Sequence, residues 1–221
     1  MYTKGRKILD LRAFTLAETL ITLAVVGVVS AMTIPNLVGA FNESAYANAL
    51  KKAYSSVQSA RKSMPTESGC SPDDYECADL TLENLSRQFR VVKEVGDCKR
   101  KCPNSNTDCE CFITEDGMIY FSPDGTMASF GVDINGVKGP NRNGRDVYLF
   151  ETKTKDSKDM ADYRVGTLFP VGSKSWSYYK YGNDSGYWRT SGRCTTEAAD
   201  KGLPEALECT GRVLDEERLE Y

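Results

Sequence analysis

The pattern of apolar and polar positions divides the chain into a helical N-terminal part and a β-rich C-terminal part. From Phe14 to Ile34, 21 residues contain a single ionisable side chain, that of Glu18. This run has about the ~20 residues that a helix needs to cross the hydrocarbon core of a bilayer. A carboxylate is costly in hydrocarbon, so Glu18 requires a physical explanation.

A helical pattern continues beyond this apolar run. Apolar side chains recur at steps of three and four residues, which places them on one face of a helix: Tyr46, Leu50, Ala53, Val57, Ala60 and Met64. Basic side chains fall off this stripe: Lys51, Lys52, Arg61 and Lys62. The pattern predicts one helix from Phe14 to Met64 whose second half packs against a folded domain. Pro35 lacks a backbone N–H, so we expect a bend or a local loosening of the helix there.

After Pro65 the chain changes to short extended runs separated by turn residues. The runs that alternate or are bounded by turn signals cover residues 89–95, 111–134 and 146–151. The aromatic segment 176–190 is predicted to form an edge hairpin. The predicted fold class is therefore α+β, with a long N-terminal helix whose outer half packs on a C-terminal antiparallel β-sheet.

Composition and charge exclude several classes of function. The net charge of −3 gives no basic surface of the kind that displaces counterions from phosphates, so nucleic-acid binding is not predicted. Histidine is absent, which removes the commonest general base and the usual imidazole metal ligand. The sequence also lacks a nucleophile–base pair and a phosphate-binding loop. We therefore expect that the protein is not an enzyme.

Residues 12–37 carry a recognisable motif. A leader with four basic residues and one acidic residue is followed by an apolar helix, and the residues at the junction are Ala13, Phe14, Thr15, Leu16 and Glu18. This combination resembles the N-terminal signal of type IV pilins and type II secretion pseudopilins. The resemblance implies that a prepilin peptidase cuts between Ala13 and Phe14 and methylates the new N-terminus, while the helix remains as a membrane anchor. The family usually has Gly before the cut bond, and Ala13 is the nearest substitute in size.

The resemblance also implies a role for Glu18. Its carboxylate would pair with the free α-amine of Phe14 on a neighbouring subunit and so set the stagger between adjacent helices. The alternative is an interfacial Glu18 that reaches the lipid headgroups. The implied partners are other pilin or pseudopilin subunits in a helical filament, the prepilin peptidase and an inner-membrane assembly platform. The implied location is the bacterial inner membrane, with the C-terminal domain in the periplasm or outside the cell.

The expected organisation has four parts. A basic leader covers residues 1–13, a membrane and assembly helix 14–38, its amphipathic continuation 39–64 and an extracytoplasmic β-rich domain 65–221. The expected function is that of a structural subunit of a type IV pilus or a type II secretion filament. The alternative is a periplasmic enzyme or solute-binding domain, held by an uncleaved anchor or preceded by a conventional signal peptide that ends near Val29, Ser30 and Ala31.

All eight cysteines lie in the C-terminal part, as expected for an oxidising compartment. Cys70 and Cys77 bracket one short segment, and Cys194 and Cys209 bracket another, so both are expected to be closed loops. The second resembles the C-terminal disulfide loop of pilins. Four more cysteines lie within 14 residues: Cys98, Cys102, Cys109 and Cys111. Two disulfides are the favoured interpretation of this cluster, and a four-cysteine zinc site is the alternative.

The segment 133–146 is rich in Asp, Asn and Gly. Asp133, Asn135 and Asp146 offer oxygen atoms of the kind that calcium binds. The spacing is not that of an EF-hand, because Gly136 comes too early and no Glu closes the loop. A turn held by Asx hydrogen bonds is the favoured interpretation, and calcium binding is the alternative.

Overall fold

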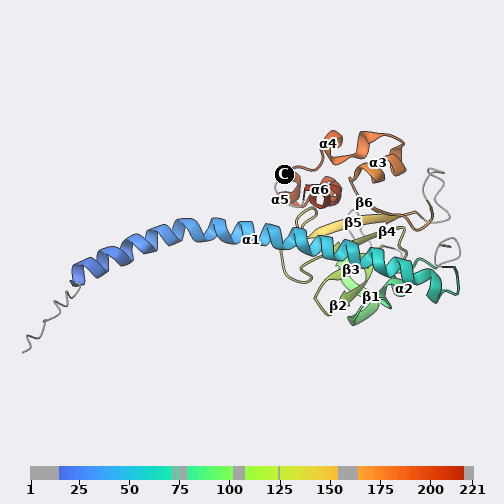
Figure 1. Cartoon of the computed structure of the whole chain (residues 1–221), viewed down its shortest axis with the longest axis horizontal. Coiled ribbons are helices and arrows are strands. Elements are labelled where there is room, and N and C mark those ends of the chain that lie inside the picture. Colours follow the sequence, from blue (N-terminus) through green and yellow to red (C-terminus); the bar gives the residue numbers. More distant parts are fainter. Residues whose placement is uncertain are drawn as a thin grey trace, which may run out of the picture. The chain divides into compact units, whose positions relative to one another are not determined.

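The computed structural model (Figure 1) describes residues 15–71, 74, 79–101, 108–123, 125–153 and 164–216, without the side chains of 35–41 and 97–101. The chain divides into two compact units, Met1–Asn42 and Glu43–Tyr221. Helix α1 (Leu16–Glu67) contributes to both units. The helix predicted over 14–64 is confirmed, and each of its ends lies two or three residues further along the chain.

Helix α1 is terminated by a glycine just beyond its last residue and not by the proline near its C-terminus. Pro65 lies in the last turn, where its missing N–H removes only one hydrogen bond. Gly69 then adopts a positive φ of 78°, and the Cys70 N–H donates to the Pro65 carbonyl oxygen at 2.8 Å. This is the left-handed C-terminal cap in which glycine is favoured, because it has no Cβ.

Among the described residues, six strands form one antiparallel sheet in sequence order. They are β1 (Val91–Lys101), β2 (Asp108–Thr114), β3 (Ile119–Ser122), β4 (Ser129–Asp133), β5 (Val147–Thr152) and β6 (Leu168–Pro170). The short helix α2 (Leu82–Ser86) precedes the sheet and is capped by the Thr81 hydroxyl. The extended runs predicted over 89–95, 111–134 and 146–151 are confirmed as β1 to β5, and the sheet confirms the α+β class.

One face of the sheet packs on the second half of α1, because successive strand residues point to opposite faces. This face carries a row of register partners across β2 to β5: Phe112, Tyr120, Val132 and Tyr148. Helix α1 adds six residues to the same core, each at most 7% exposed: Ala47, Leu50, Ala53, Val57, Ala60 and Met64. The predicted apolar stripe is thus confirmed, although Tyr46 is only partly buried.

The opposite face of the sheet has a smaller core of its own, which includes Cys109, Cys111, Ile119, Phe121 and Val147. Phe121 lies opposite Gly131 in the register of β3 and β4. A Cβ at position 131 would lie 2.2 Å from the Phe121 ring, so only glycine leaves room for this ring.

Short helices follow the sheet and gather beside β5 and β6 (Figure 1): α3 (Lys174–Tyr181), η1 (Asp184–Gly186), α4 (Trp188–Ser191), α5 (Thr196–Lys201), η2 (Pro204–Glu208) and α6 (Cys209–Glu216). The edge hairpin predicted over 176–190 is therefore wrong. The Ser173 hydroxyl accepts a hydrogen bond from the Trp176 N–H and starts α3, which ends at Gly182. This N-cap and the burial of Trp176 and Tyr179 on one helix face outweigh the β propensity of the aromatic residues.

The disulfide predicted between Cys194 and Cys209 is confirmed. Cys70, Cys109 and Cys111 are also disulfide-bonded, and among the described residues no cysteine is free. Two members of the four-cysteine cluster are thus oxidised. The side chains of Cys77, Cys98 and Cys102 lie outside the described part of the chain, so the pairings that involve them stay predictions.

Candidate functional site

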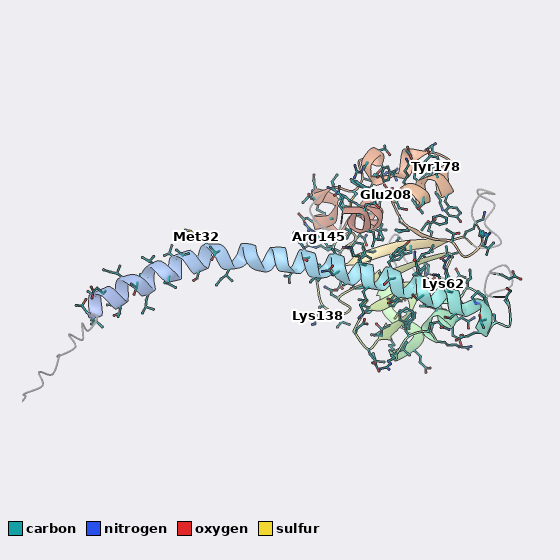
Figure 2. All side chains as sticks on the ribbon, in the orientation of Figure 1. Met32, Lys62, Lys138, Arg145, Tyr178 and Glu208 are labelled. Atoms are coloured by element: carbon teal, nitrogen blue, oxygen red, sulfur yellow. A yellow bond between two sulfur atoms is a disulfide. The ribbon has the colours of Figure 1, made fainter. Side chains whose placement is uncertain are left out.

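The first part of α1 is an exposed apolar helix. Its segment Leu16–Ile34 has 19 residues and a mean hydropathy of 1.9, and none of it is buried within the structure. Figure 2 shows side chains that project from both sides of this ribbon, among them Met32, which is 71% exposed. By length and composition this segment is apolar enough to cross a membrane.

Glu18 lies in the first turn of this helix and contacts Thr15. Its Oε2 atom accepts hydrogen bonds from the backbone N–H and from the hydroxyl of Thr15, both at 2.9 Å. In return, the Thr15 hydroxyl oxygen accepts the Glu18 N–H at 3.2 Å. This reciprocal arrangement is a capping box, in which two backbone donors at a helix N-terminus are satisfied together. The carboxylate also lies at the positive end of the helix dipole.

The sequence contained the signal for this pair. Thr15 is followed three residues later by Glu18 and then by an apolar run, which is the pattern of a helix N-terminus. The partners predicted for Glu18 were a neighbouring subunit and the lipid headgroups, and the partner within the same turn was missed.

The predicted processing residues Ala13 and Phe14 lie outside the described residues. Helix α1 begins at Leu16, two residues after Phe14, so the bond proposed for cleavage precedes the helix. Pro35 lies within α1, but its side chain is not described, and a bend at this position stays a prediction.

Polar contacts tie the second half of α1 to loops of the sheet. Lys52 Nζ lies 2.7 Å from Asp116 Oδ2, in the turn between β2 and β3. Partial burial raises the pKa of Asp116, but hydrogen bonds from Lys52 and from Thr114 outweigh it, so the pKa lies below its ordinary value. Near the start of the unit, the Tyr46 hydroxyl accepts a hydrogen bond from the Asn135 amide at 3.2 Å.

The loop between β4 and β5 contains the candidate calcium residues. Asp133 and Asp146 are fully buried. Asp133 Oδ1 accepts the N–H of Asn135 at 3.3 Å, which is the predicted Asx turn. The two oxygens of Asp146 accept the N–H groups of Asn141 and Arg142, at 2.7 and 2.6 Å. The Asp146 carboxylate therefore binds backbone N–H groups four and five residues earlier in the chain and stabilises the turn of this loop.

Other oxygen atoms of this loop converge on Asn141. With its amide nitrogen turned toward them, Asn141 donates to Asp133 Oδ2 at 2.9 Å and to the Gly136 carbonyl oxygen at 3.0 Å. Asn135 Oδ1 is buried and has no hydrogen-bond partner among the described residues. The oxygens of Asp133, Asn135 and Gly136 suit calcium, and each of the two oxygens of Asp146 already accepts one backbone N–H. Calcium binding stays a prediction.

No protein-family model, curated protein or solved structure matches this chain.

Proposed function

We propose that the protein is a structural subunit of a filament of the type IV pilus or type II secretion class, anchored and assembled through α1. The observation that carries the proposal is the composition of α1. The segment Leu16–Ile34 of α1 is exposed and apolar. The second half of α1 is buried on the sheet of the Glu43–Tyr221 unit. A helix with both properties offers an apolar assembly surface in its first half and is part of a folded domain in its second half.

The capping box gives Glu18 two successive partners under this proposal. In the uncut chain Glu18 satisfies donors of its own helix through Thr15. After cleavage before Phe14, a free ammonium group becomes available on each subunit. This cation can replace two hydrogen bonds to Oε2 with an ion pair between subunits, and a paired carboxylate is far less costly in hydrocarbon than an isolated one. In this proposal the hydrogen bonds from Thr15 hold the Glu18 carboxylate at the helix start until the ammonium group of a neighbouring subunit replaces them.

The alternative is a periplasmic enzyme or solute-binding domain that uses α1 only as an anchor. Such a protein needs the segment Leu16–Ile34 for membrane attachment, and Glu18 serves it only as the cap of this helix, without a partner on another subunit. The two proposals therefore differ in what they require of Glu18 and of the N-terminus.

Mass analysis of the N-terminus of membrane-purified protein is the first test. We expect a chain that begins at a methylated Phe14, whereas an intact Met1 or a start at Met32 would support the alternative. The second test expresses Glu18→Ala in a strain that lacks the wild-type subunit. We expect a processed, membrane-bound protein that yields few or no sheared filaments, and a milder defect for Glu18→Gln.

Thr22→Val is the matched control for these variants. The Thr22 hydroxyl donates to the Thr19 carbonyl oxygen at 2.9 Å, one turn further along the same helix. Its loss should leave processing and filament yield unchanged. If Glu18→Ala yields as many sheared filaments as wild type, the Glu18 carboxylate has no role in assembly.

A further inference from the structure

A cavity of about 470 Å³ lies within the Glu43–Tyr221 unit, between β5 and the C-terminal helices. Leu149, Val171, Pro204 and Leu207 form its apolar wall. Figure 2 places Glu208, which also lines the cavity, among the short helices that follow the sheet. The cavity is far from α1 residues 16–34 in the sequence, and its chemistry does not depend on the proposed filament.

Glu208 presents one unused acceptor. The residue is 6% exposed, and its Oε1 accepts a hydrogen bond from Arg193 at 2.9 Å. Its Oε2 is shielded from solvent and has no hydrogen-bond partner among the described residues. A buried carboxylate oxygen without a donor is destabilising, since nothing replaces the hydrogen bonds that water made to it.

Trp176 also lines the cavity and has one unused donor. The residue is 4% exposed, and its Nε1 also lacks a partner within the described part of the chain. The indole N–H can only donate, so it requires an oxygen or nitrogen acceptor. Two residues that line the cavity, Glu208 and Trp176, therefore carry an acceptor and a donor that the described residues leave unsatisfied.

The charge of the lining favours a cation. Three carboxylates line the cavity, those of Glu151, Glu205 and Glu208, against the single guanidinium of Arg193. Arg193 occupies one oxygen of Glu208, and Lys180 lies 3.5 Å from Glu151. An anion would meet an excess of negative charge, whereas an ammonium group would bring donors to the free oxygen of Glu208.

We propose that this cavity binds an aliphatic primary ammonium group whose carrier also offers a neutral oxygen acceptor. The ammonium donates to Glu208 Oε2, the carrier oxygen accepts the Trp176 N–H, and the methylene stem lies along Leu149 and Leu207. A lysine side chain within a peptide has this chemistry, and a free alkylamine has part of it.

The test is calorimetric titration of the full-length protein in detergent with three small molecules. Nα-acetyl-lysine amide carries the ammonium and two carbonyl groups, Nα-acetyl-norleucine amide lacks the ammonium, and cadaverine lacks the carbonyls. We expect the lysine derivative to bind at least about tenfold more tightly than the norleucine derivative, because a charged hydrogen bond to Glu208 is lost. We expect cadaverine to bind more weakly than the lysine derivative, because it has no acceptor for the Trp176 N–H. Equal binding of the two would overturn the requirement for an oxygen acceptor on the carrier.

Glu208→Gln should weaken binding of the lysine derivative by about tenfold or more. Glu216→Gln is the matched control, since Glu216 pairs with Arg212 at 3.0 Å and does not line the cavity. If Glu208→Gln fails to fold, the comparison of the two amides on wild-type protein still decides. Equal affinity for the two amides, no saturable heat with the lysine derivative, or full binding by a folded Glu208→Gln would each overturn the proposal.

Discussion

Lys52 and Asp116 form an ion pair of 2.7 Å that joins the second half of α1 to the turn between β2 and β3. Its atoms are partly exposed, since the side chains of Lys52 and Asp116 keep 60% and 37% of their accessible surface. Ion pairs of this kind stabilise proteins only modestly, because water screens them. The contribution of the Lys52–Asp116 pair to the free energy of unfolding can nevertheless be measured through its dependence on pH.

Asp116→Asn should lower the free energy of unfolding by about 0.5 kcal/mol at pH 7. The folded-state pKa of Asp116 lies below its ordinary value, so its charge stabilises the fold above the unfolded pKa of about 3.9. This contribution is lost as the pH falls through the folded pKa. Urea unfolding of both proteins from pH 7 to pH 2 measures the difference. A gap between wild type and variant that widens on acidification would contradict this assignment.

The unit Glu43–Tyr221 should fold without the apolar segment. Its core lies within its own residues, from Ala47 in α1 to Val213 in α6. We expect a fragment of residues 43–221 to be soluble without detergent and to unfold cooperatively, as measured by gel filtration and near-ultraviolet circular dichroism. A fragment of residues 68–221 is the control, because it lacks the buried stripe of α1 and exposes the sheet face. Aggregation of the longer fragment with its disulfides intact would argue against the unit boundary.

Leu50→Ala should destabilise that unit strongly. Leu50 is fully buried between α1 and the sheet, and truncation of such a residue costs about 2–5 kcal/mol. Leu203→Ala is the matched control, since Leu203 is 40% exposed and its truncation should change stability by less than about 0.5 kcal/mol. Chemical denaturation of the two variants decides. Similar losses for both would mean that α1 is not docked through this stripe.

Thr15→Val should loosen the first turn of α1. The variant loses both hydrogen bonds made through the Thr15 hydroxyl, and loss of an N-cap costs about 1 kcal/mol. In detergent micelles we expect the backbone amides at positions 15 and 18 of the variant to exchange with solvent about fivefold faster than in wild type. Thr22→Val should leave these amides unchanged. Equal exchange in Thr15→Val and Thr22→Val would show that the cap does not hold the helix start.

Asp146→Asn should destabilise the β4–β5 loop whether or not calcium is present. The substitution removes one of two acceptors for the N–H groups of Asn141 and Arg142, at a cost of about 1–3 kcal/mol. Thermal melts with chelator and with calcium separate the two interpretations. A loss of stability that appears only with calcium would identify Asp146 as a metal ligand. Asp133→Asn, measured in the same way, reports on the other oxygen atoms of the loop.

Periodicity predicted the elements that bury one regular face. The steps of the α1 stripe and the alternation in β2 to β5 are long enough to reveal helix and strand, and both are confirmed. The C-terminal helices were not predicted, because each has at most eight residues and some of them depend on single caps such as those of Ser173 and Thr195. The cavity beside Glu208 is lined by residues from β5, α3 and η2, which are far apart in the sequence. No local sequence pattern indicates that they lie together.

The order of the strands along the chain determines how the domain is able to fold. Each strand of the meander pairs with its immediate successor, so every step closes a loop of at most 15 residues, at a small entropic cost compared with a pairing of distant segments. The α1 stripe is different, because Leu50 and Val57 share a core with Tyr148 and Phe150, almost a hundred residues later. The sheet face that receives α1 is therefore complete only after β5 has emerged. If the first part of α1 is held in a membrane while the chain folds, the second part of α1 stays near the membrane surface, where it can dock once the last strands of the sheet have formed.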